Sequence, residues 1–262
     1  MPELPDVQVF KEYFDATSLK KEIAGVAAQD ERLLEGIGQK DLEARLVGKS
    51  FTGTQRHGKY LFVRFGGHDF LVLHFGMTGF LRAYKDEDKA PEHIGLLLCF
   101  TDGYHLAYYC RRRLGRIGLT DTVDEFIRNR ELGPDAGELC SDREAFAARL
   151  QGHRGAIKSL LMNQKVMAGI GNIYADEILY RAGVHPQRKS DALDSGERRS
   201  LAVKACQVFK TAIAKRAGEK GWPRGWLLPR REAGRACPRC AGKIKRITVA
   251  GRGTYFCPGH QS

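Results

Sequence analysis

Four residues near the C-terminus have the types and the spacing of a metal site. Cys237 and Cys240 form a C-x-x-C pair, and Cys257 and His260 form a C-x-x-H pair after sixteen intervening residues. Three thiolates and one imidazole suit Zn²⁺ in a closed tetrahedral site, which leaves no position open for catalysis. The pattern therefore predicts one structural zinc ion per chain, which staples a tail too short for a core of its own.

The N-terminus carries a second candidate for chemistry. Pro2 is a small residue that permits removal of Met1, which would free a secondary amine. An α-amino group has a pKa of about 8, well below that of lysine, so it can act as a nucleophile and form an iminium with a sugar carbon. Glu3 stands beside it as an acid or base. A proline at position 2 is also an ordinary rigid start to a helix, and the residues alone leave both interpretations open.

The elements that must position these residues change in character along the chain. Residues 7–22 carry apolar side chains near helical spacing, which predicts a helix. Residues 50–120 consist of short apolar runs separated by glycines, and Asp102-Gly103 is a hairpin signal. The first half of the chain is therefore predicted to contain a β domain.

The second half has helical periodicity. It predicts helices over residues 143–150, 156–163, 173–181 and 195–216. A glycine-containing turn at residues 168–172 separates the second of these helices from the third. Two helices that flank such a turn form a compact module.

The charge distribution indicates an acidic partner. The 262 residues include 43 Lys and Arg and 31 Asp and Glu, for a net charge of +12. Residues 1–50 carry a net −3, whereas residues 218–262 carry a net +8. The composition excludes disorder, collagen and a small disulfide scaffold, and no apolar run is long enough to span a membrane.

Cysteine usage and the N-terminus indicate a reducing compartment. Seven cysteines form only one C-x-x-C pair, and Met1 to Phe10 carries acids where a signal peptide needs a basic head. We therefore expect a cytoplasmic protein. The cysteines outside the metal site, Cys99, Cys110, Cys140 and Cys206, are expected to be unpaired thiols.

Five separated motifs, in the same order, resemble the formamidopyrimidine-DNA glycosylase and endonuclease VIII family over nearly the whole chain. One of them is the terminal zinc hairpin with Arg252-Gly253-Thr254-Tyr255. The other four are Pro2-Glu3-Leu4-Pro5, His57-Gly58-Lys59-Tyr60, His74-Phe75-Gly76-Met77-Thr78-Gly79 and Gly169-Ile170-Gly171-Asn172-Ile173-Tyr174-Ala175-Asp176-Glu177.

The resemblance implies an α+β fold, with an N-terminal β-sandwich, a helix-two-turn-helix domain and a C-terminal zinc-finger hairpin. The corresponding segments are residues 1–130, 131–217 and 218–262. It implies a base-excision-repair enzyme, both a DNA glycosylase and an abasic-site lyase. Its partner would be double-stranded DNA with damaged bases or abasic sites. We expect a monomer with no membrane partner, associated with the nucleoid.

The resemblance also implies the catalytic residues. Pro2 corresponds to the nucleophile and Glu3 to its proton-transferring partner. Lys59 corresponds to a lysine that binds a phosphate beside the lesion, and Arg252 to the finger arginine that reaches the same phosphates. An exposed lysine with a buried stem is the alternative for Lys59.

Three further residues match positions that fill the space left by a flipped base. Met77 matches a wedge, Leu114 a second wedge, and Arg112 an arginine that binds the orphaned base. Core packing is the ordinary role of a methionine, but the flanking Gly76 and Gly79 favour a protruding loop.

The remaining DNA contacts implied by the resemblance are Lys158, Asn172 and Tyr174. Asn172 and Tyr174 lie at the start of a predicted helix, whose free backbone N–H groups suit an anion such as phosphate. A helix cap is the alternative for Asn172.

Several positions depart from the family pattern. Asp6 and Leu114 stand where Glu and a bulky aromatic are common, and His260 stands where most relatives have cysteine. The segment between Arg216 and Cys237 is short, so the lid over a flipped 8-oxoguanine is reduced, although Trp222 or Trp226 could stack on the base instead.

Two functions without catalysis remain as alternatives. The chain could be a reader of damaged DNA with the same fold, or a structural nucleic-acid-binding protein like those of ribosomes. Retention of both Pro2 and Glu3 favours the enzyme, because DNA binding alone requires neither residue.

Overall fold

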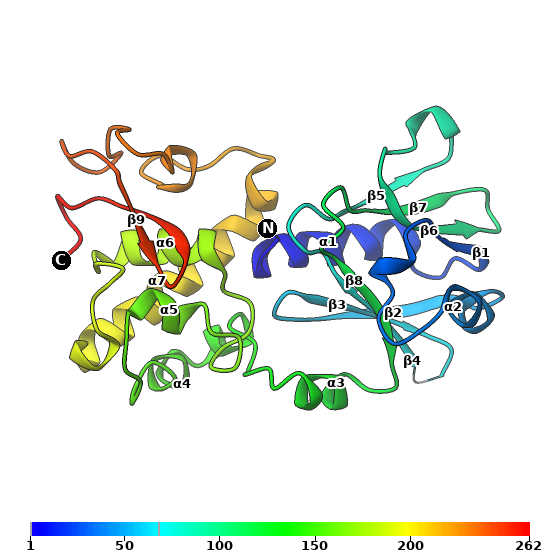
Figure 1. The fold of residues 1–262 in the computed structure, drawn as a ribbon, viewed down its shortest axis with the longest axis horizontal. Helices are drawn as coiled ribbons and strands as arrows, with labels where there is room; N and C mark the ends of the chain where they lie inside the picture. Colours follow the sequence, from blue (N-terminus) through cyan, green and yellow to red (C-terminus); the bar gives the residue numbers. More distant parts are fainter. Residues whose placement is uncertain (1, 68) are drawn as a thin grey trace. The chain divides into compact units, whose positions relative to one another are not determined.

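The computed structural model describes residues 2–67 and 69–262, and the chain divides into two compact units (Figure 1). The first unit consists of Pro2 and residues 7–131, and the second consists of residues 3–6 and 132–262. Helix α1, Leu4–Ser18, therefore begins among residues of the second unit. In the described parts of the chain, no helix is both long and apolar enough to cross a membrane.

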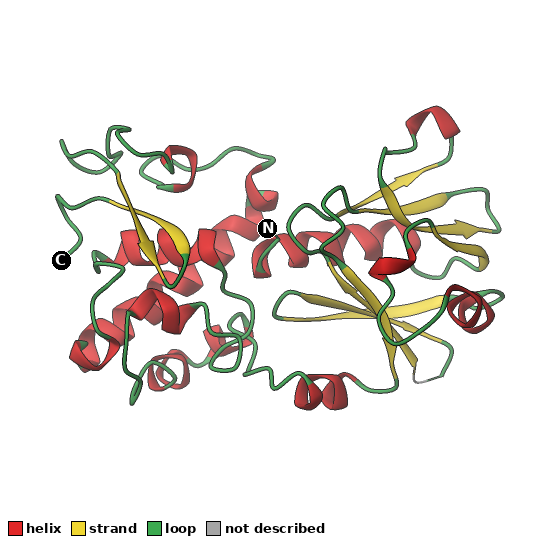
Figure 2. Ribbon diagram, viewed as in Figure 1, coloured by secondary structure: helices red, strands yellow, loops and turns green. Residues whose placement is uncertain are grey.

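The first unit contains two antiparallel four-stranded sheets, with strand orders β1-β6-β7-β5 and β2-β3-β4-β8 (Figure 2). Both sheets contribute side chains to one apolar core, and a second, smaller cluster with Phe62, Phe70, Val72 and Val123 buries residues on another face of the β2-β3-β4-β8 sheet. The strands are β1 Ile23–Ala28, β2 Phe51–His57, β3 Tyr60–Phe65, β4 Asp69–His74, β5 Phe80–Tyr84, β6 Ile94–Phe100, β7 His105–Tyr109 and β8 Arg116–Thr120.

Helix α1 completes this sandwich. Val7 and Phe14 of α1 are fully buried in the same core as Ile23 of one sheet and Leu61 of the other. Two short helices, α2 Gln39–Leu46 and α3 Val123–Asn129, cover other parts of the unit. Since one continuous apolar core supports both sheets, the loops that join the strands are free to carry polar and exposed side chains.

The second unit is helical and matches the predicted pattern. Its helices are α4 Arg143–Ala148, α5 Ile157–Leu161, α6 Asn172–Ala182 and α7 Ser195–Ala214. A capping box begins α7, and Gly183 ends α6 in the left-handed conformation. The core of this unit also takes in Leu4 and Trp226, so segments far apart in sequence share one apolar centre.

A two-stranded hairpin follows the helices, with β9 Lys245–Val249 paired antiparallel to β10 Arg252–Phe256. The predicted order of β-sandwich, helical module and hairpin is thereby confirmed.

One expectation about the cysteines is wrong. Cys140 and Cys206 form a disulfide, with a Cα–Cα distance of 5.5 Å. They lie 66 residues apart, and only the packing of α7 against the segment before α4 brings them together. Their spacing in the sequence therefore gave no sign of a pair.

Candidate active site and metal centre

The carboxylate of Glu3 is fully buried and is bound by the start of α6. Its oxygens accept hydrogen bonds from the backbone N–H groups of Gly171 at 2.8 Å, Ile173 at 2.8 Å and Tyr174 at 3.1 Å. The first N–H groups of a helix have no partner within it, and the helix dipole favours a negative charge there. The anion that this helix terminus binds in the structure is therefore a carboxylate of the chain itself, not a phosphate.

Two glycines make this arrangement possible. A Cβ added to Gly171 would lie 2.4 Å from Glu3 Cδ. Gly169 has a φ of +117°, and a Cβ there would lie 2.7 Å from Leu4 Cδ1. Leu4 also donates its backbone N–H to the Gly169 carbonyl at 3.0 Å. The glycine pattern of this turn is visible in the sequence, but its partner is not: the turn receives residues 3 and 4.

A second carboxyl group lies beside Glu3. Asp6 accepts the backbone N–H of Glu3 at 2.9 Å. Burial raises the pKa of Asp6 to about 7, and the negative charge of Glu3 acts in the same direction. Pro2 directly precedes Glu3 and is half-buried, whereas Met1, whose removal was predicted, lies outside the described residues. Two neighbouring carboxyl groups with different environments are a common basis for acid and base roles.

Lys59 lies in the turn between β2 and β3, where Gly58 takes a positive φ of 57°. Its side chain is half-buried. Burial, together with the positive charges of Lys59 and Arg116, lowers the pKa of His74 to about 4. His74 is therefore neutral at neutral pH, and Lys59 belongs to a positively charged region at this end of the sheet.

The three predicted hole-filling residues lie on two adjoining loops of the first unit. Met77 is 37% exposed and Leu114 is 45% exposed, and both are among the most exposed large apolar residues described. The Arg112 N–H donates to the Thr78 hydroxyl at 3.3 Å. A Cβ on Gly76, whose φ is +57°, would lie 2.5 Å from the Leu114 carbonyl, so the two loops touch through their backbones. The fold thus brings Met77, Arg112 and Leu114 together on exposed loops.

Two residues predicted to contact DNA have buried side chains. Lys158 is fully buried, and its Nζ lies 2.7 Å from Asp176 Oδ1 and 2.7 Å from Thr254 Oγ1. Tyr174 is 3% exposed and belongs to the core. Residues two positions apart lie on nearly opposite sides of an α-helix, so Tyr174 points inward from the side opposite the half-buried Asn172. Neither side chain is available to a phosphate in this structure.

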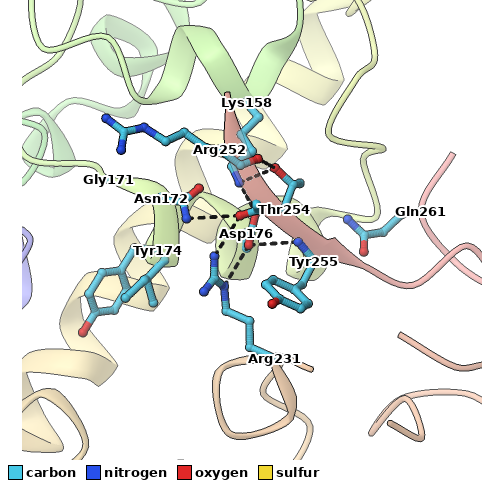
Figure 3. Close-up of polar contacts among 12 residues, drawn as sticks. Lys158, Gly171, Asn172, Tyr174, Asp176, Arg231, Arg252, Thr254, Tyr255 and Gln261 are labelled. Atoms are coloured by element: carbon cyan, nitrogen blue, oxygen red, sulfur yellow. Dashed lines mark hydrogen bonds and ion pairs between the residues drawn. The ribbon is translucent and has the colours of Figure 1, made fainter. Parts of the chain in front are cut away.

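Asn172 and Arg252 stand at the junction of α6 with the hairpin (Figure 3). Asn172 donates from Nδ2 to the Gly253 carbonyl at 3.2 Å. It makes no capping hydrogen bond, and the residue at the cap position is Gly171, so the alternative of a helix cap fails. Arg252 is exposed and is the first residue of β10.

The four predicted metal ligands converge. The ligand atoms of Cys237, Cys240, Cys257 and His260 all lie within 4.8 Å of one another. His260 Nδ1 is 3.8 Å and 3.7 Å from the sulfurs of Cys237 and Cys240, and the sulfurs of Cys240 and Cys257 are 3.4 Å apart. Zn–S bonds of about 2.3 Å in a tetrahedron require edges of this order. The four residues are therefore positioned to bind one zinc ion.

A tyrosine that the sequence analysis missed supports this centre. The Tyr180 hydroxyl lies 3.1 Å from the sulfur of Cys237, and its ring packs edge-on against His260 at 4.7 Å. Tyr180 is fully buried on α6, so it links the metal centre to the helix that binds Glu3.

The short segment after α7 packs onto the helices. Trp226 is 3% exposed and belongs to the core, Trp222 stacks on it at 5.1 Å, and Arg181 lies over its ring. Trp226 is therefore not available to stack on a flipped base, contrary to one expectation, and Trp222 already has an aromatic partner.

A β-sandwich, a helical module that binds the Glu3 carboxylate, and a hairpin with four converged metal ligands are the parts of a DNA glycosylase of base excision repair, as the matching family models show. The formamidopyrimidine-DNA glycosylase N-terminal domain matches residues 1–117, and its H2TH domain matches residues 132–221. The zinc finger found in FPG and IleRS matches residues 234–258. The chain belongs to the formamidopyrimidine-DNA glycosylase family.

Comparisons with individual proteins support the assignment to this family. The formamidopyrimidine-DNA glycosylase of Latilactobacillus sakei is 32% identical over 98% of this chain and 97% of its own length. That of Moorella thermoacetica is 33% identical over 94% of each chain. A solved structure of MutM with DNA containing carbocyclic 8-oxo-G is 30% identical, with a TM-score of 0.88 over the full length of both chains. A Lactococcus lactis Fpg structure with DNA containing an oxidized pyrimidine is 28% identical, with a TM-score of 0.89.

The predicted enzyme class, a DNA glycosylase with abasic-site lyase activity, is confirmed by membership of this family. The alternative of a reader without catalysis is not favoured.

Proposed function

We propose that Pro2 and Glu3 are the catalytic pair that removes oxidised bases from duplex DNA. The observation that carries this proposal is the Glu3 carboxylate, which is buried, fixed by three N–H groups and next to Pro2 in the chain. A carboxylate held so firmly is suited to proton transfer at one defined place.

The proposed reaction begins after Met1 is removed. The lone pair of the Pro2 nitrogen forms a bond to C1′ of the damaged nucleotide, and the electron pair of the glycosidic bond leaves with the base, which takes up a proton. The nitrogen then gives up its proton, and its lone pair forms the C=N bond of an iminium as the C1′–O4′ bond breaks and O4′ takes up a proton. This iminium makes the protons on C2′ acidic. Loss of one of them expels the 3′ phosphate and cuts the strand. Glu3 serves as the acid or base for these transfers.

Phosphate binding is assigned to Lys59, Asn172 and Arg252. An amide nitrogen carries two N–H groups, so Asn172 can hold the hairpin with one and a phosphate with the other. Each neutralised phosphate contributes about −0.9 to the slope of log affinity against log salt concentration. Arg252→Ala should therefore weaken binding to every lesion alike and flatten that slope, whereas loss of a single lesion would assign Arg252 to base recognition.

The chemistry is tested by reduction with borohydride in the presence of duplex DNA that contains an abasic site. We expect a covalent adduct on the Pro2 nitrogen, since an iminium can be reduced and an encounter complex cannot. An adduct mapped to a lysine, in protein shown to lack Met1, would disprove the role of Pro2. Protein that retains Met1 is the matched control and should form no adduct.

The preferred lesion follows from the short segment after α7. Because this segment packs on the helical core, we propose that 8-oxoguanine is a poorer substrate than ring-opened purines, oxidised pyrimidines or preformed abasic sites. A base held by fewer buried hydrogen bonds is discriminated less well from its parent. Single-turnover excision on matched duplexes tests this, and an 8-oxoguanine rate equal to that of an oxidised pyrimidine would refute it.

We further propose that one chain acts alone on one lesion, in the cytoplasm at the nucleoid. The segments 1–130, 131–217 and 218–262 would serve as the catalytic sandwich, the DNA-binding helical module, and the linker with its zinc finger. The strongly basic tail supports contact with DNA. Sedimentation of the chain with and without a short duplex tests the stoichiometry, and a two-to-one complex on a single lesion would contradict it.

A further inference from the structure

A buried polar network joins α6 to the zinc hairpin through residues that have no role in the proposed reaction (Figure 3). Asp176 and Lys158 are both fully buried, and their charged atoms lie 2.7 Å apart. Arg231 donates from Nε to the second oxygen of Asp176 at 2.9 Å. One buried carboxylate thus faces two cations. Such a cluster costs desolvation free energy that apolar packing would not.

Two members of the network also bind the hairpin. The backbone N–H of Tyr255 donates to Asp176 Oδ2 at 3.1 Å. Lys158 Nζ donates to Thr254 Oγ1 at 2.7 Å, and that hydroxyl donates to the Arg252 carbonyl at 3.0 Å. A continuous chain of hydrogen bonds therefore runs from the α6 carboxylate to the backbone of Arg252.

A third hairpin residue is held by the same elements. The Gly253 carbonyl accepts from Arg231 Nη2 at 3.2 Å and from Asn172 Nδ2 at 3.2 Å. Three consecutive residues, 253–255, are therefore fixed by side chains of the helical module. The apolar cluster that the hairpin shares with Tyr180 of α6 is small, so these polar contacts add substantially to what holds the hairpin on α6.

The backbone that precedes Arg252 is restricted by the hairpin turn. Ala250 and Gly251 both have positive φ, 47° and 71°, as in a tight two-residue turn, and Arg252 pairs with Val249 directly after it. The side chain of Arg252 extends away from the network (Figure 3). The backbone on both sides of Arg252 is thus held in place. This reduces the conformational entropy that is lost when the exposed Arg252 guanidinium binds an anion.

We infer that Asp176 is a positioning residue, which acts through Lys158, Thr254 and the hairpin backbone to place Arg252 for phosphate binding. Asp176 itself touches neither DNA nor reacting atoms. This inference rests on the assignment of Arg252 as a phosphate ligand in the proposed function.

The test is a double-mutant cycle in full-length, zinc-loaded protein on duplex DNA with a stable abasic-site analogue. Asp176→Asn keeps an acceptor near Tyr255 but removes the charge that holds Lys158 and Arg231. We expect the dissociation constant to rise on the order of tenfold. We also expect the salt slope to fall by about 0.9, as for Arg252→Ala. In the Arg252→Ala background, Asp176→Asn should cause no further loss, because the group that it positions is absent.

Glu177→Gln is the matched control. Glu177 is the next residue on α6 and is equally buried, but it accepts the backbone N–H of Leu228 rather than any N–H of the hairpin. This variant should leave the salt slope unchanged even if it lowers the melting temperature. Zinc content should be the same in all variants.

The outcomes separate the two proposals. If Arg252→Ala leaves DNA binding unchanged, the phosphate role of Arg252 is wrong. If Arg252→Ala weakens binding but Asp176→Asn does not, or if the two losses add in full, Arg252 keeps its role and the positioning role of Asp176 is refuted. Should Asp176→Asn fail to fold, Thr254→Val removes the same link without a change in charge and should give the same non-additive loss.

Discussion

The exposed loops of the first unit and the buried start of α6 in the second unit hold their side chains in opposite ways. In the first unit, Met77 and Leu114 stand exposed on loops, and the contact between the loops lies in the backbone beneath them. In the second unit, Glu3, Lys158 and Asp176 are fully buried and bound to backbone or to one another. An exposed side chain can act on DNA with its own atoms. A buried charged side chain acts by holding another group, or on a substrate brought to it.

The difference has an energetic basis. An exposed loop residue contributes little to folding, so its replacement should change the reaction and leave stability alone. A buried carboxylate has lost its hydration and depends on every partner that remains, so removal of one partner affects both stability and function. Substitutions of exposed and of buried residues should therefore separate into two classes.

The largest effect is expected at the turn that binds Glu3. Gly171→Ala places a methyl group 2.4 Å from Glu3 Cδ, so either the carboxylate or the start of α6 must move. We expect single-turnover excision to fall by about 10²–10⁴, the usual contribution of a positioned acid or base. Gly53→Ala is the control, because its added Cβ meets no atom within 4 Å. Equal rates for the two variants would contradict the role assigned to Glu3.

Removal of zinc should have a comparably large effect, confined to the second unit. Chelation should abolish duplex binding, since the hairpin that carries Arg252 depends on the metal, while the sheets of the first unit keep their circular dichroism signal. His260→Ala should weaken zinc retention, and His260→Cys should preserve it. A chelated protein that binds DNA normally would show that the hairpin is dispensable.

A smaller, pH-dependent effect is expected from Asp6. Its pKa is raised from 3.8 to about 7, chiefly by burial. Between those values the folded chain holds a proton that the unfolded chain has lost, so the free energy of unfolding falls as pH rises through this window and levels off above it. An asparagine at position 6 does not ionise, so the Asp6→Asn variant does not lose stability as pH rises. Its free energy of unfolding at pH 8 should exceed that of the wild type by up to about 4 kcal/mol.

Tryptophan fluorescence can follow the unfolding of the second unit separately. Both tryptophans of the chain, Trp222 and Trp226, lie in that unit. The difference between wild type and Asp6→Asn should grow between pH 4 and pH 7 and then stay constant. A difference that does not vary with pH would show that Asp6 ionises normally.

The same contrast explains what could be predicted from the sequence. Periodicity located the helices and the sandwich, and the ligand spacing located the metal centre, because each depends on local pattern. Exposure of Met77 followed from its flanking glycines. Motif matching does not distinguish residues that touch DNA from residues that support them. Lys158 was predicted as a DNA contact, and its ion pair with Asp176 could not be read from the motif.

Contacts between segments far apart in the chain could not be predicted from local sequence pattern. The bond between Cys140 and Cys206, and the approach of residue 3 to residue 171, both require the packed tertiary structure. The glycine spacing of Gly169 and Gly171 was a usable signal for close backbone approach. It indicated where a partner fits without indicating which partner.

The smallest effect is expected at the exposed loops of the first unit. It tests whether an exposed residue can be replaced with a loss of activity but no loss of stability. Leu114 is 45% exposed and its side chain supports no core, so Leu114→Ala should leave the melting temperature unchanged. If Leu114 enters the space left by a flipped base, its truncation removes apolar contact that offsets lost stacking. Excision at limiting enzyme should then fall by about tenfold or less. Val47→Ala, at a residue 39% exposed on the same unit, controls for loss of an exposed apolar group and should excise normally. A Leu114→Ala protein that loses stability but not activity would place Leu114 among the supporting residues, and the separation into exposed and buried classes would fail in the first unit.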